Sequence, residues 1–347
     1  MNLKELSNHL GISPTTVSRA LGGYPEVSEK TRLKVQVAAK KFHYSANTRA
    51  KSLATGRAMM IGHILPGATK DEMVNPIFGD FLSGASGTYT KHGYDLLLSQ
   101  VASGDEERAY NNLKAKGAID GLIVQGPSID EPRIKLLNRL GIPFVLHGRA
   151  SEVTEPYNWV DVNNTHCFLR ATQFLLNLGH KRIALINGLE HMDFAKRRRE
   201  GYLDALCQAA ISSQALYMHC SQMTEDQGYQ AAYSMLELPV PPTAFLVSSL
   251  ISAIGVRRAI SDKGLKMGQD ISVIIHDDDI SYLRNGRDIP IFTATRSSVF
   301  EAGQLCAEML IDVIENPNPN GNTRHILLES QLLVGQSTGP APLAWYD

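Results

Sequence analysis

The sequence predicts a small all-α head with a helix-turn-helix, followed by a larger α/β body in two lobes. The chain has 347 residues, too many for a single small core. Residues 1–57 carry ten Lys or Arg against three Glu, a net charge of +7, so the rest carries −8 of the total of −1. From residue 59 onward, apolar runs alternate with helical segments, a pattern typical of parallel strands covered by helices.

Composition argues against several classes of protein. With 43% hydrophobic and 20% charged residues, the chain is typical of an ordinary globular protein. Its four cysteines form no CxxC pair, which favours neither a zinc finger nor a disulfide framework. The N-terminal residues lack the apolar core of a signal peptide, and no 18 apolar residues run together. We therefore expect a cytoplasmic protein with no membrane partner.

The first two helices are predicted from apolar spacing and capping residues. Leu3, Leu6 and Leu10 form one apolar stripe, which Gly11 can end. Ser13 then offers an N-cap oxygen, and the proline after it suits the first helical position. Two short helices about a glycine turn make a helix-turn-helix.

The outer face of the second helix is expected to read DNA. Val17 and Leu21 are four residues apart and can face the first helix. A helix presented in this way fits the major groove, where arginine binds guanine and threonine contacts the thymine methyl group. The residues assigned to DNA in this segment are Ser13, Thr15, Thr16, Ser18 and Arg19. The alternative is that they are ordinary solvent-facing residues of a small helical bundle.

A third helix is expected to begin after Ser28, which can cap it. Its buried stripe is predicted to comprise Thr31, Val35, Ala38 and Phe42. Three lysines are left for solvent or phosphate, namely Lys34, Lys40 and Lys41.

Three stretches of the head resemble the lactose-repressor/galactose-repressor (LacI/GalR) family of bacterial regulators: "SPTTVSRALGG", "VSEKTRLKV" and "NTRAKSLATGRAMMIGHILP". The resemblance implies a hinge helix at about 47–55 that inserts a leucine into the minor groove. Asn47 would cap this helix, with Leu53 at the wedge position and Ala54 beside it. Because so short a helix is marginal alone, we expect it to form only against its twin on DNA. The alternative is a linker whose Leu53 packs on the body.

The body, residues 58–347, contains apolar runs typical of strands: "MMIGHIL", "YDLLLS", "GLIVQG", "PFVLHG", "RIALING", "TAFLVS" and "ISVIIHDD". Near residue 160, "WVDVNN" is expected to cross between lobes. We expect lobe 1 at about 58–160 and 292–322, and lobe 2 at about 161–291 and 323–347. Ligands of open parallel sheets bind beyond the carboxyl ends of the strands, so a ligand is expected between the lobes.

The body resembles the same family, whose effector domain is built like a type I periplasmic sugar-binding protein, in "LGHKRIALI", "RRREGYLDAL" and "SVIIHDD". The resemblance implies that Arg198 grips the ligand and that Asp277 binds its hydroxyls. Rings and charged groups together suit a saccharide. The expected effector-binding residues are Phe78, Gln125, Phe194, Arg198, Met223, Ser249 and Asp277.

Some positions depart from the family pattern. Many members carry an Asn-Asp or Ser-Asp pair after the "AFLV" strand, where this chain has Ser249 and Leu250. His276 precedes the cleft aspartate where a tyrosine or similar residue is usual, and "LLVGQSTG" lacks an arginine. These departures leave the effector unnamed.

Two motifs favour other chemistry at first sight. The "DDD" at 277–279 suggests a metal, but consecutive carboxylates on an extended stretch point alternately apart. "GQSTG" at 335–339 satisfies G-x-S-x-G, but two prolines follow in place of a helix. Neither a P-loop nor an H-E-x-x-H motif is present. We expect no metal, no cofactor and no catalytic residue, and hence no enzyme.

Two functions from different classes remain open on the sequence. One is a transcriptional regulator that responds to a ligand, and the other is a cytosolic sugar-binding or sugar-processing protein that does not act on DNA. The head favours the first. We expect a repressor of carbohydrate uptake or catabolism genes, bound to operator DNA as a homodimer and released by a mono- or oligosaccharide. The chain ends without the heptad tail of tetrameric members, which also favours two subunits.

Overall fold

The computed structural model describes residues 1–22, 24–42, 44, 56–66, 75–102, 104–317 and 322–342. The chain divides into two compact units. The head is Met1–Met59 with Gly117–Ile119, and the body is Met60–Lys116 with Asp120–Asp347.

The head is a bundle of three helices, as the sequence predicts: α1 (Leu3–Leu10), α2 (Pro14–Leu21) and α3 (Glu29–Lys41). The first helix begins with a capping box, in which Asn2 Oδ1 accepts from the Glu5 N–H at 2.9 Å. It ends at Gly11, whose φ of 65° is left-handed and suits glycine. Ser13 caps α2 and Ser28 caps α3, which confirms both predicted helix starts.

The head closes a hydrophobic core of its own. The buried side chains are Leu6, Val17, Ala20, Val27, Val35, Ala38 and Ala39. The predicted stripe of α3 is confirmed at Val35 and Ala38, whereas Thr31 and Phe42 are half-buried. The polar face of α2 is left outside this core, so the apolar spacing sets which side chains α2 presents to solvent.

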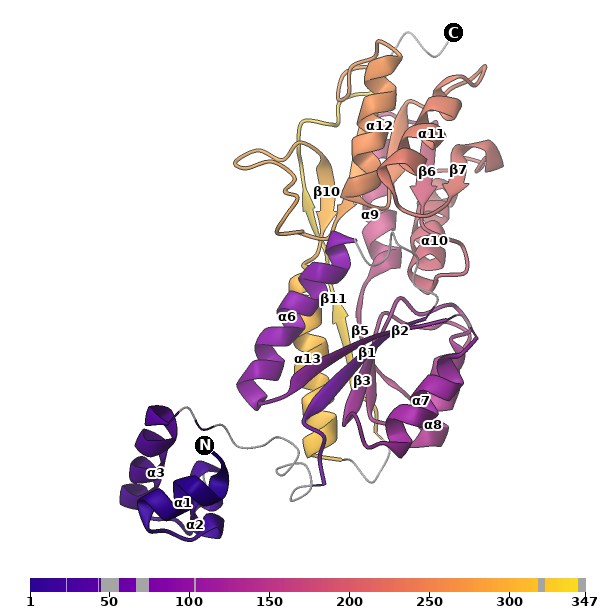
Figure 1. The fold of residues 1–347 in the computed structure, drawn as a ribbon. Coiled ribbons are helices and arrows are strands. Elements are labelled where there is room, and N and C mark those ends of the chain that lie inside the picture. Colours follow the sequence, from indigo (N-terminus) through magenta and orange to yellow (C-terminus); the bar gives the residue numbers. More distant parts are fainter. Residues whose placement is uncertain are drawn as a thin grey trace. The chain divides into compact units, whose positions relative to one another are not determined.

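The first sheet of the body has the strand order β11-β5-β4-β3-β1-β2, and its pairings are all parallel. The bounds are β1 (Met60–Pro66), β2 (Asp95–Val101), β3 (Gly121–Gln125), β4 (Phe144–His147), β5 (Asn158–Val162) and β11 (His325–Leu328). The helices α6 (Pro76–His92) and α13 (Val299–Glu315) pack together and α13 covers β3, β4 and β5, while α7 (Glu106–Ala115) and α8 (Pro132–Leu140) form another pair (Figure 1). We call these elements the first lobe.

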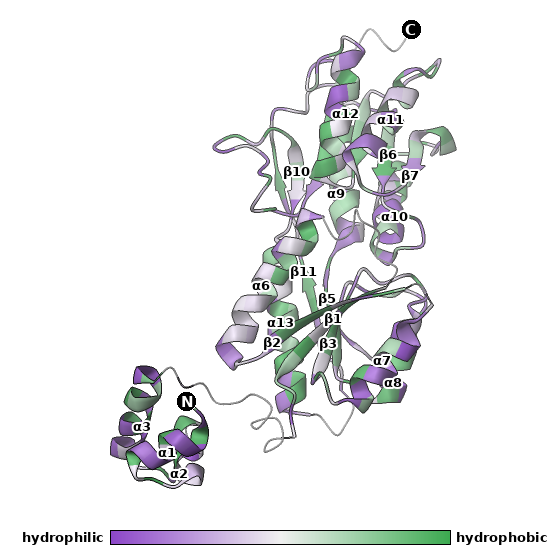
Figure 2. Ribbon diagram, in the orientation of Figure 1, coloured by the Kyte–Doolittle hydropathy of each residue, from purple (hydrophilic) through white to green (hydrophobic). Residues whose placement is uncertain are grey.

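The second sheet has the order β12-β10-β9-β8-β6-β7, in which β12 is antiparallel to β10. The bounds are β6 (Ile183–Asn187), β7 (Met218–Cys220), β8 (Ala244–Val247), β9 (Ser272–Asp277), β10 (Thr293–Arg296) and β12 (Gln331–Leu333). The helix pairs α9 (Asn164–Asn177) with α10 (Asp193–Gln208), and α11 (Glu225–Leu236) with α12 (Leu250–Asp262), contact it, and a 3-10 turn η1 (Ala215–Tyr217) precedes β7. These elements form the second lobe, and helices in both lobes mix hydrophobic and hydrophilic segments (Figure 2).

The chain crosses between the lobes after β5, after β10 and after β11. Two expected lobe limits differ from this arrangement. Residues 293–296, expected in lobe 1, form β10 in the second sheet beside β9. Residues 325–328, expected in lobe 2, form β11 in the first sheet beside β5. The β10 segment reads TATR and has no apolar run, and each of the two strands pairs with a neighbour that is distant in sequence, so a local pattern does not reveal which sheet it joins.

Glycines let paired helices approach closely. A Cβ on Gly201 of α10 would lie 2.0 Å from the carbonyl oxygen of Thr165 in α9. A Cβ on Gly84 of α6 would lie equally close, 2.0 Å, to the carbonyl oxygen of Phe300 in α13. Each helix pair therefore packs backbone against backbone, which fixes the positions of the residues that α10 and α6 direct toward the cleft.

No helix in the described ranges is long and apolar enough to cross a membrane.

Candidate functional site

The outer face of α2 presents three polar side chains to solvent: Thr15, Ser18 and Arg19. Ser13 and Thr16 have local partners as well. Ser13 Oγ accepts from the Thr16 N–H at 3.1 Å and lies 2.8 Å from Thr16 Oγ1, so this pair builds the start of the helix. Arg19 is thus exposed on a face whose helix is fixed by its own cap.

Lys34 lies on α3, where a phosphate contact was expected. Its Nζ donates to the carbonyl oxygen of Leu10 at 3.3 Å, which ties α3 to the end of α1. The other residues predicted to contact DNA, Asn47, Leu53 and Ala54, lie outside the described residues.

The body contains a cavity of about 1160 Å³ to which both lobes contribute. The first lobe supplies the start of α6 and the β3–α8 segment, and the second supplies the start of α10 and the end of β9. These are carboxyl ends of strands and amino ends of helices, where ligands of α/β sheets bind. Five of the expected effector residues line the cavity: Phe78, Gln125, Phe194, Arg198 and Met223.

Ser249 and Asp277 were expected in the cleft and are not among its lining residues. Ser249 is buried as the N-cap of α12, where its Oγ accepts from the Ser252 N–H at 3.1 Å. Asp277 forms an ion pair with Arg296, with 2.9 Å between Oδ2 and Nη2. The side chains of Ser249 and Asp277 therefore make contacts within the second lobe.

Of the three consecutive aspartates at 277–279, Asp278 is the one that lines the cavity. Its Oδ1 lies 3.5 Å from Nε2 of His276. Burial raises the pKa of Asp278, but His276 and Arg198 outweigh burial and hold that pKa below its ordinary value. Asp278 is thus an anion in the cavity, a position that the run of three aspartates hid from sequence reasoning.

Arg198 is buried, lines the cavity and is held by two hydrogen bonds. Its Nε donates to Asn164 Oδ1 and its Nη1 to the Ser248 carbonyl oxygen, both at 2.7 Å. The guanidinium carbon lies 5.2 Å from the ring centre of Phe168 and 4.9 Å from that of Phe194. Burial lowers the pKa of Arg198, and Asp278 opposes that shift. The guanidinium is therefore fixed before any ligand arrives.

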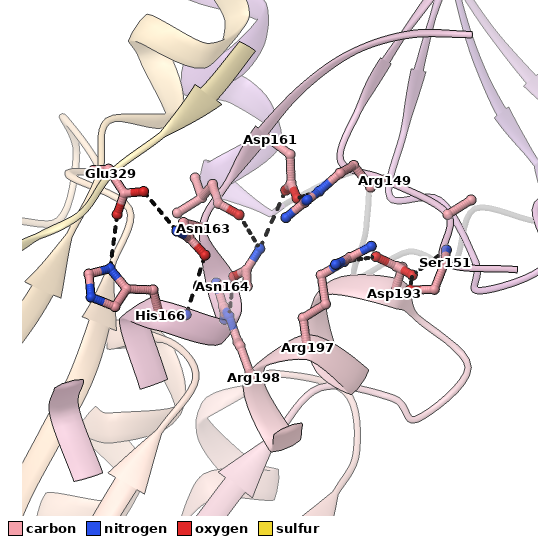
Figure 3. A network of polar contacts seen from close by, with 12 residues as sticks. Arg149, Ser151, Asp161, Asn163, Asn164, His166, Asp193, Arg197, Arg198 and Glu329 are labelled. Atoms are coloured by element: carbon pink, nitrogen blue, oxygen red, sulfur yellow. Dashed lines mark hydrogen bonds and ion pairs between the residues drawn. The ribbon is translucent and has the colours of Figure 1, made fainter. Parts of the chain in front are cut away.

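A chain of polar contacts connects Arg198 to the crossing between the lobes (Figure 3). Asn164, which holds Arg198, also donates through Nδ2 to Asp161 Oδ1 at 3.4 Å. Asp161 accepts from Arg149 Nε at 2.7 Å in the first lobe. Burial raises the pKa of Asp161, and Arg149 acts against that shift. Asn164 and Asp161 both line the cavity; they belong to "WVDVNN", which the sequence analysis assigned to the crossing between the lobes but not to the ligand site.

Two carboxylates join the lobes directly. Asp193 at the start of α10 accepts from the Ser151 N–H at 2.7 Å and from Arg197 Nε at 2.5 Å. Asp80 of α6 accepts from the Ser281 hydroxyl at 2.6 Å. The Asp193–Ser151 and Asp80–Ser281 contacts each pair an element of the first lobe with one of the second, whereas the Asp193–Arg197 pair lies within α10.

His276, which lines the cavity, contacts the buried Cys167 of α9, with 3.5 Å between Nδ1 and Sγ. Burial and Arg198 lower the pKa of His276, yet Cys167 and Asp278 outweigh them and raise it to about 9. Burial raises the pKa of Cys167, but His276 together with the hydroxyls of Ser330 and Thr295 outweighs burial and lowers that pKa to about 7. Within the described part of the chain, no cluster of His, Cys, Asp or Glu is arranged to hold a metal ion.

Family models match both parts of the chain. Residues 59–332 match "Periplasmic binding proteins and sugar binding domain of LacI family", and residues 2–47 match "Bacterial regulatory proteins, lacI family". The chain is 42% identical to the HTH-type transcriptional regulator AglR of Rhizobium meliloti (strain 1021) over 343 residues, which cover 99% of this chain and 95% of AglR.

Solved structures agree with this relationship. A transcriptional regulator CelR-cellobiose complex matches with a TM-score of 0.71 and 25% identity, covering 97% of this chain and 99% of that one. A lac repressor dimer bound to operator and an anti-inducer matches with a TM-score of 0.81 over 98% of this chain and 99% of that one; at 24% identity this shows the fold. The helix-turn-helix head and the two-sheet body both have counterparts there, and the chain belongs to the lacI family of bacterial regulatory proteins.

Proposed function

We propose that this protein binds operator DNA as a homodimer through its head, and that a saccharide between the lobes of the body changes its affinity for DNA. The observation that carries the proposal is the cavity that both lobes line, with a fixed arginine among its lining residues. A ligand there contacts both lobes at once, so its binding energy depends on the angle between them.

The head supplies the DNA contact. Arg19 reads a base edge, with Thr15 and Ser18 beside it, and Ser13 and Thr16 fix the helix start near the backbone phosphates. The net charge of +7 over residues 1–57 attracts the duplex. Asn47, Leu53 and Ala54 act in the minor groove, as the family resemblance implies.

The cleft supplies the effector site. A sugar has apolar ring faces and several hydroxyls, and the cavity offers Phe78 and Phe194 together with Arg198 and Asp278. Gln125 and Met223 complete its walls. The cellobiose of the CelR complex supports this class of ligand.

The body forms the dimer. Large apolar side chains are exposed on it, among them Leu96 and Leu98 on the edge strand β2. An exposed apolar edge of this kind is covered in a stable protein, and a second copy covers it symmetrically. Two heads then read two half-sites of a near-palindromic operator.

The protein acts in the cytoplasm and is not an enzyme. The serine of the G-x-S-x-G match, Ser337, is completely buried; its hydroxyl donates to the Val273 carbonyl oxygen and accepts from the Thr293 N–H at 2.8 Å. A nucleophile needs exposure at a strand-to-helix turn, so this motif has a packing role.

The test uses the full chain and an operator selected from random DNA by binding to the purified protein. Fluorescence anisotropy measures operator affinity with and without each member of a saccharide panel. We expect one class of saccharide to weaken operator binding by about 5- to 150-fold. Arg198→Ala should bind the operator but ignore the sugar, whereas Arg199→Ala, an exposed neighbour paired with Glu190, should respond normally. An Arg198→Ala variant that responds like the wild type would place the effector elsewhere.

A further inference from the structure

The buried thiol of Cys167 contacts an imidazole that borders the cavity. Cys167 lies near the start of α9, and its Sγ is 3.5 Å from Nδ1 of His276 near the end of β9. Each of these two side chains is 1% exposed, yet His276 is among the residues that line the cavity. His276 also departs from the family pattern, in which a tyrosine or similar residue precedes the cleft aspartate. The contact is therefore a feature of this chain that the function proposed above does not use.

Each ring nitrogen of His276 faces groups that can accept a hydrogen bond. At Nδ1 these are the Cys167 sulfur and Thr295 Oγ1, at 3.5 and 3.3 Å. At Nε2 they are Ser297 Oγ and Asp278 Oδ1, at 3.3 and 3.5 Å. A protonated imidazole donates from both nitrogens, whereas a neutral one donates from only one. The protonated ring thus satisfies both sides at once, and a thiolate at Cys167 is its counter-ion on the side of α9.

Two cysteines of almost the same exposure differ in their electrostatic surroundings. Cys167 is 1% exposed and Cys306 on α13 is 0% exposed, and burial raises the pKa of both thiols. At Cys167, His276 and two neighbouring hydroxyls outweigh burial and lower the pKa to about 7. At Cys306, Asp161 adds to burial, and the pKa lies well above its ordinary value. Because the thiolate is the reactive form of cysteine, Cys306 is an unreactive control for Cys167 within the same molecule.

We propose that Cys167 is a modification site, at which a hydroperoxide oxidises the thiolate to a sulfenic acid and thereby weakens effector binding. The effect on the effector rests on the function proposed above, whereas the modification does not. The sulfur attacks one peroxide oxygen, so that an S–O bond forms as the O–O bond breaks. The hydroxide that leaves takes the proton of His276 and becomes water, while the sulfur loses two electrons to the peroxide. Hydrogen peroxide is little larger than water, which suits a buried thiol.

Oxidation changes the charge next to the cavity. His276 becomes neutral, so Asp278 loses the cation that lies 3.5 Å from its Oδ1. Arg198, whose charge opposes protonation of His276 and favours the ionised form of Asp278, then remains as its cationic neighbour. The sulfenic acid also adds an oxygen atom between α9 and β9, where Cys167 is closely packed. A ligand at this end of the cavity therefore binds less tightly, while the separate core of the head leaves operator binding unchanged.

The first experiment measures the modification alone. The reduced full chain is treated with hydrogen peroxide, dimedone traps the sulfenic acids, and mass spectrometry follows each cysteine separately. We expect Cys167 to be labelled at least about tenfold faster than Cys306. The rate at Cys167 should rise as the pH increases through about 7, because the thiolate forms there. Equal rates at Cys167 and Cys306 would overturn the modification site, and this comparison needs no variant, sugar or DNA.

The role of the imidazole is tested by substitution. His276→Gln removes the titrating ring but keeps a polar group, and it should bring the rate at Cys167 down to that at Cys306. His166→Gln is the matched control, because His166 precedes Cys167 on α9, is exposed and pairs with Glu329, so its rate should equal that of the wild type. An unchanged rate in a His276→Gln variant with the wild-type melting temperature would overturn the role of His276.

Operator release measures the consequence for the effector. Fluorescence anisotropy compares oxidised with reduced protein on the operator, in the presence of a saccharide that releases the wild type. The oxidised protein should need at least about fivefold more saccharide for half release. Cys167→Ser should need the same amount before and after peroxide. If oxidised and reduced wild type release alike, the effect on the effector is wrong and the modification site stands. If no saccharide releases the protein, the proposed function fails together with that effect, and the labelling rates still decide the modification site.

Discussion

The backbone N–H of Ser151 donates to Oδ1 of Asp193 over 2.7 Å, and this bond joins the segment after β4 in the first lobe to the start of α10 in the second. The same α10 carries Arg198, five residues after Asp193. The contact between the lobes and the cavity arginine Arg198 therefore lie on one rigid helix, so a change in the lobe angle moves Arg198 relative to the first lobe.

Asp193→Ala should loosen the contact between the lobes. The substitution leaves the Ser151 N–H and Arg197 without their acceptor, and we expect the free energy of unfolding to fall by about 1 to 3 kcal/mol. Urea unfolding measures the loss, and small-angle scattering should show a larger radius of gyration. The matched control is Glu190→Ala, which breaks an exposed pair with Arg199 and should cost less than about 0.5 kcal/mol. Equal losses in the two variants would refute a bridging role for Asp193.

Arg19→Ala should reduce the discrimination between DNA sequences. Arg19 is exposed on the outer face of α2, where we propose that it binds a guanine edge, so its loss should cost about 1 to 3 kcal/mol per half-site on the operator and much less on random DNA. Lys40→Ala, at an exposed position on α3, should weaken both equally if Lys40 contacts phosphate. Lys34 is unsuitable as this control, because it also bonds to the Leu10 carbonyl. If Arg19→Ala weakens operator and random DNA alike, α2 does not read bases through this residue.

Acidification should destabilise the body through buried histidines. Burial lowers the pKa of His63 to about 3 and that of His147 to about 4, from an ordinary value of 6.5. Below that ordinary value the unfolded chain takes up protons that the folded chain does not, so stability is lost as pH falls, by about 1.4 kcal/mol per pH unit for each histidine. Urea unfolding at about pH 7 and about pH 5 measures this slope.

The histidine responsible is identified by substitution. His63 bonds through Nε2 to the Tyr89 hydroxyl at 2.8 Å, and His63→Gln keeps a polar group there without titrating. This variant should lose about one proton of the pH dependence, whereas His92→Gln, at an exposed position, should keep the wild-type slope. A His63→Gln slope equal to that of the wild type would show that other groups set the acid response.

Gly201→Ala and Gly87→Ala should have opposite effects on stability, although both lie within helices. The new methyl group at 201 would meet the Thr165 carbonyl oxygen at 2.0 Å, and forcing α10 away from α9 should cost about 1 to 3 kcal/mol or more. At 87 nothing lies within 4 Å, so alanine should stabilise α6 by up to about 1 kcal/mol. Thermal unfolding of the two variants measures the difference, and a shared sign would contradict the close packing of α9 on α10.

The sequence predicted the parts of the fold that local rules determine. Ser13 and Ser28 mark helix starts through their own hydroxyls, and the buried runs of β6, β8 and β9 are continuous apolar stretches. Short strands carry no such signal. The three residues of β7 and of β12 acquire their pairing from neighbours distant in sequence, so no window of the sequence reveals them.

The identity of the cavity residues was likewise only partly predictable from local sequence. Adjacent residues at a strand end point to opposite sides, so the exchange of Asp277 for Asp278 follows from a single step along β9. Which side faces the cavity depends on where the other lobe lies. The sequence did not predict a role for Asn164, because an asparagine after a strand is common. Its role depends on its hydrogen bond with Arg198, which lies 34 residues further along the chain.

The self-contained core of the head has a consequence for how new regulators arise. Leu6, Val17 and Val35 pack inside the head, so we expect a substitution on the outer face of α2 to change the operator sequence that the head prefers and to leave the effector-binding body unchanged. DNA specificity and effector specificity can therefore be inherited separately. A single recombination event near residue 58 would join an existing effector-binding body to a head of different DNA specificity. A chimera of this kind would respond to the same effector and regulate a different set of genes.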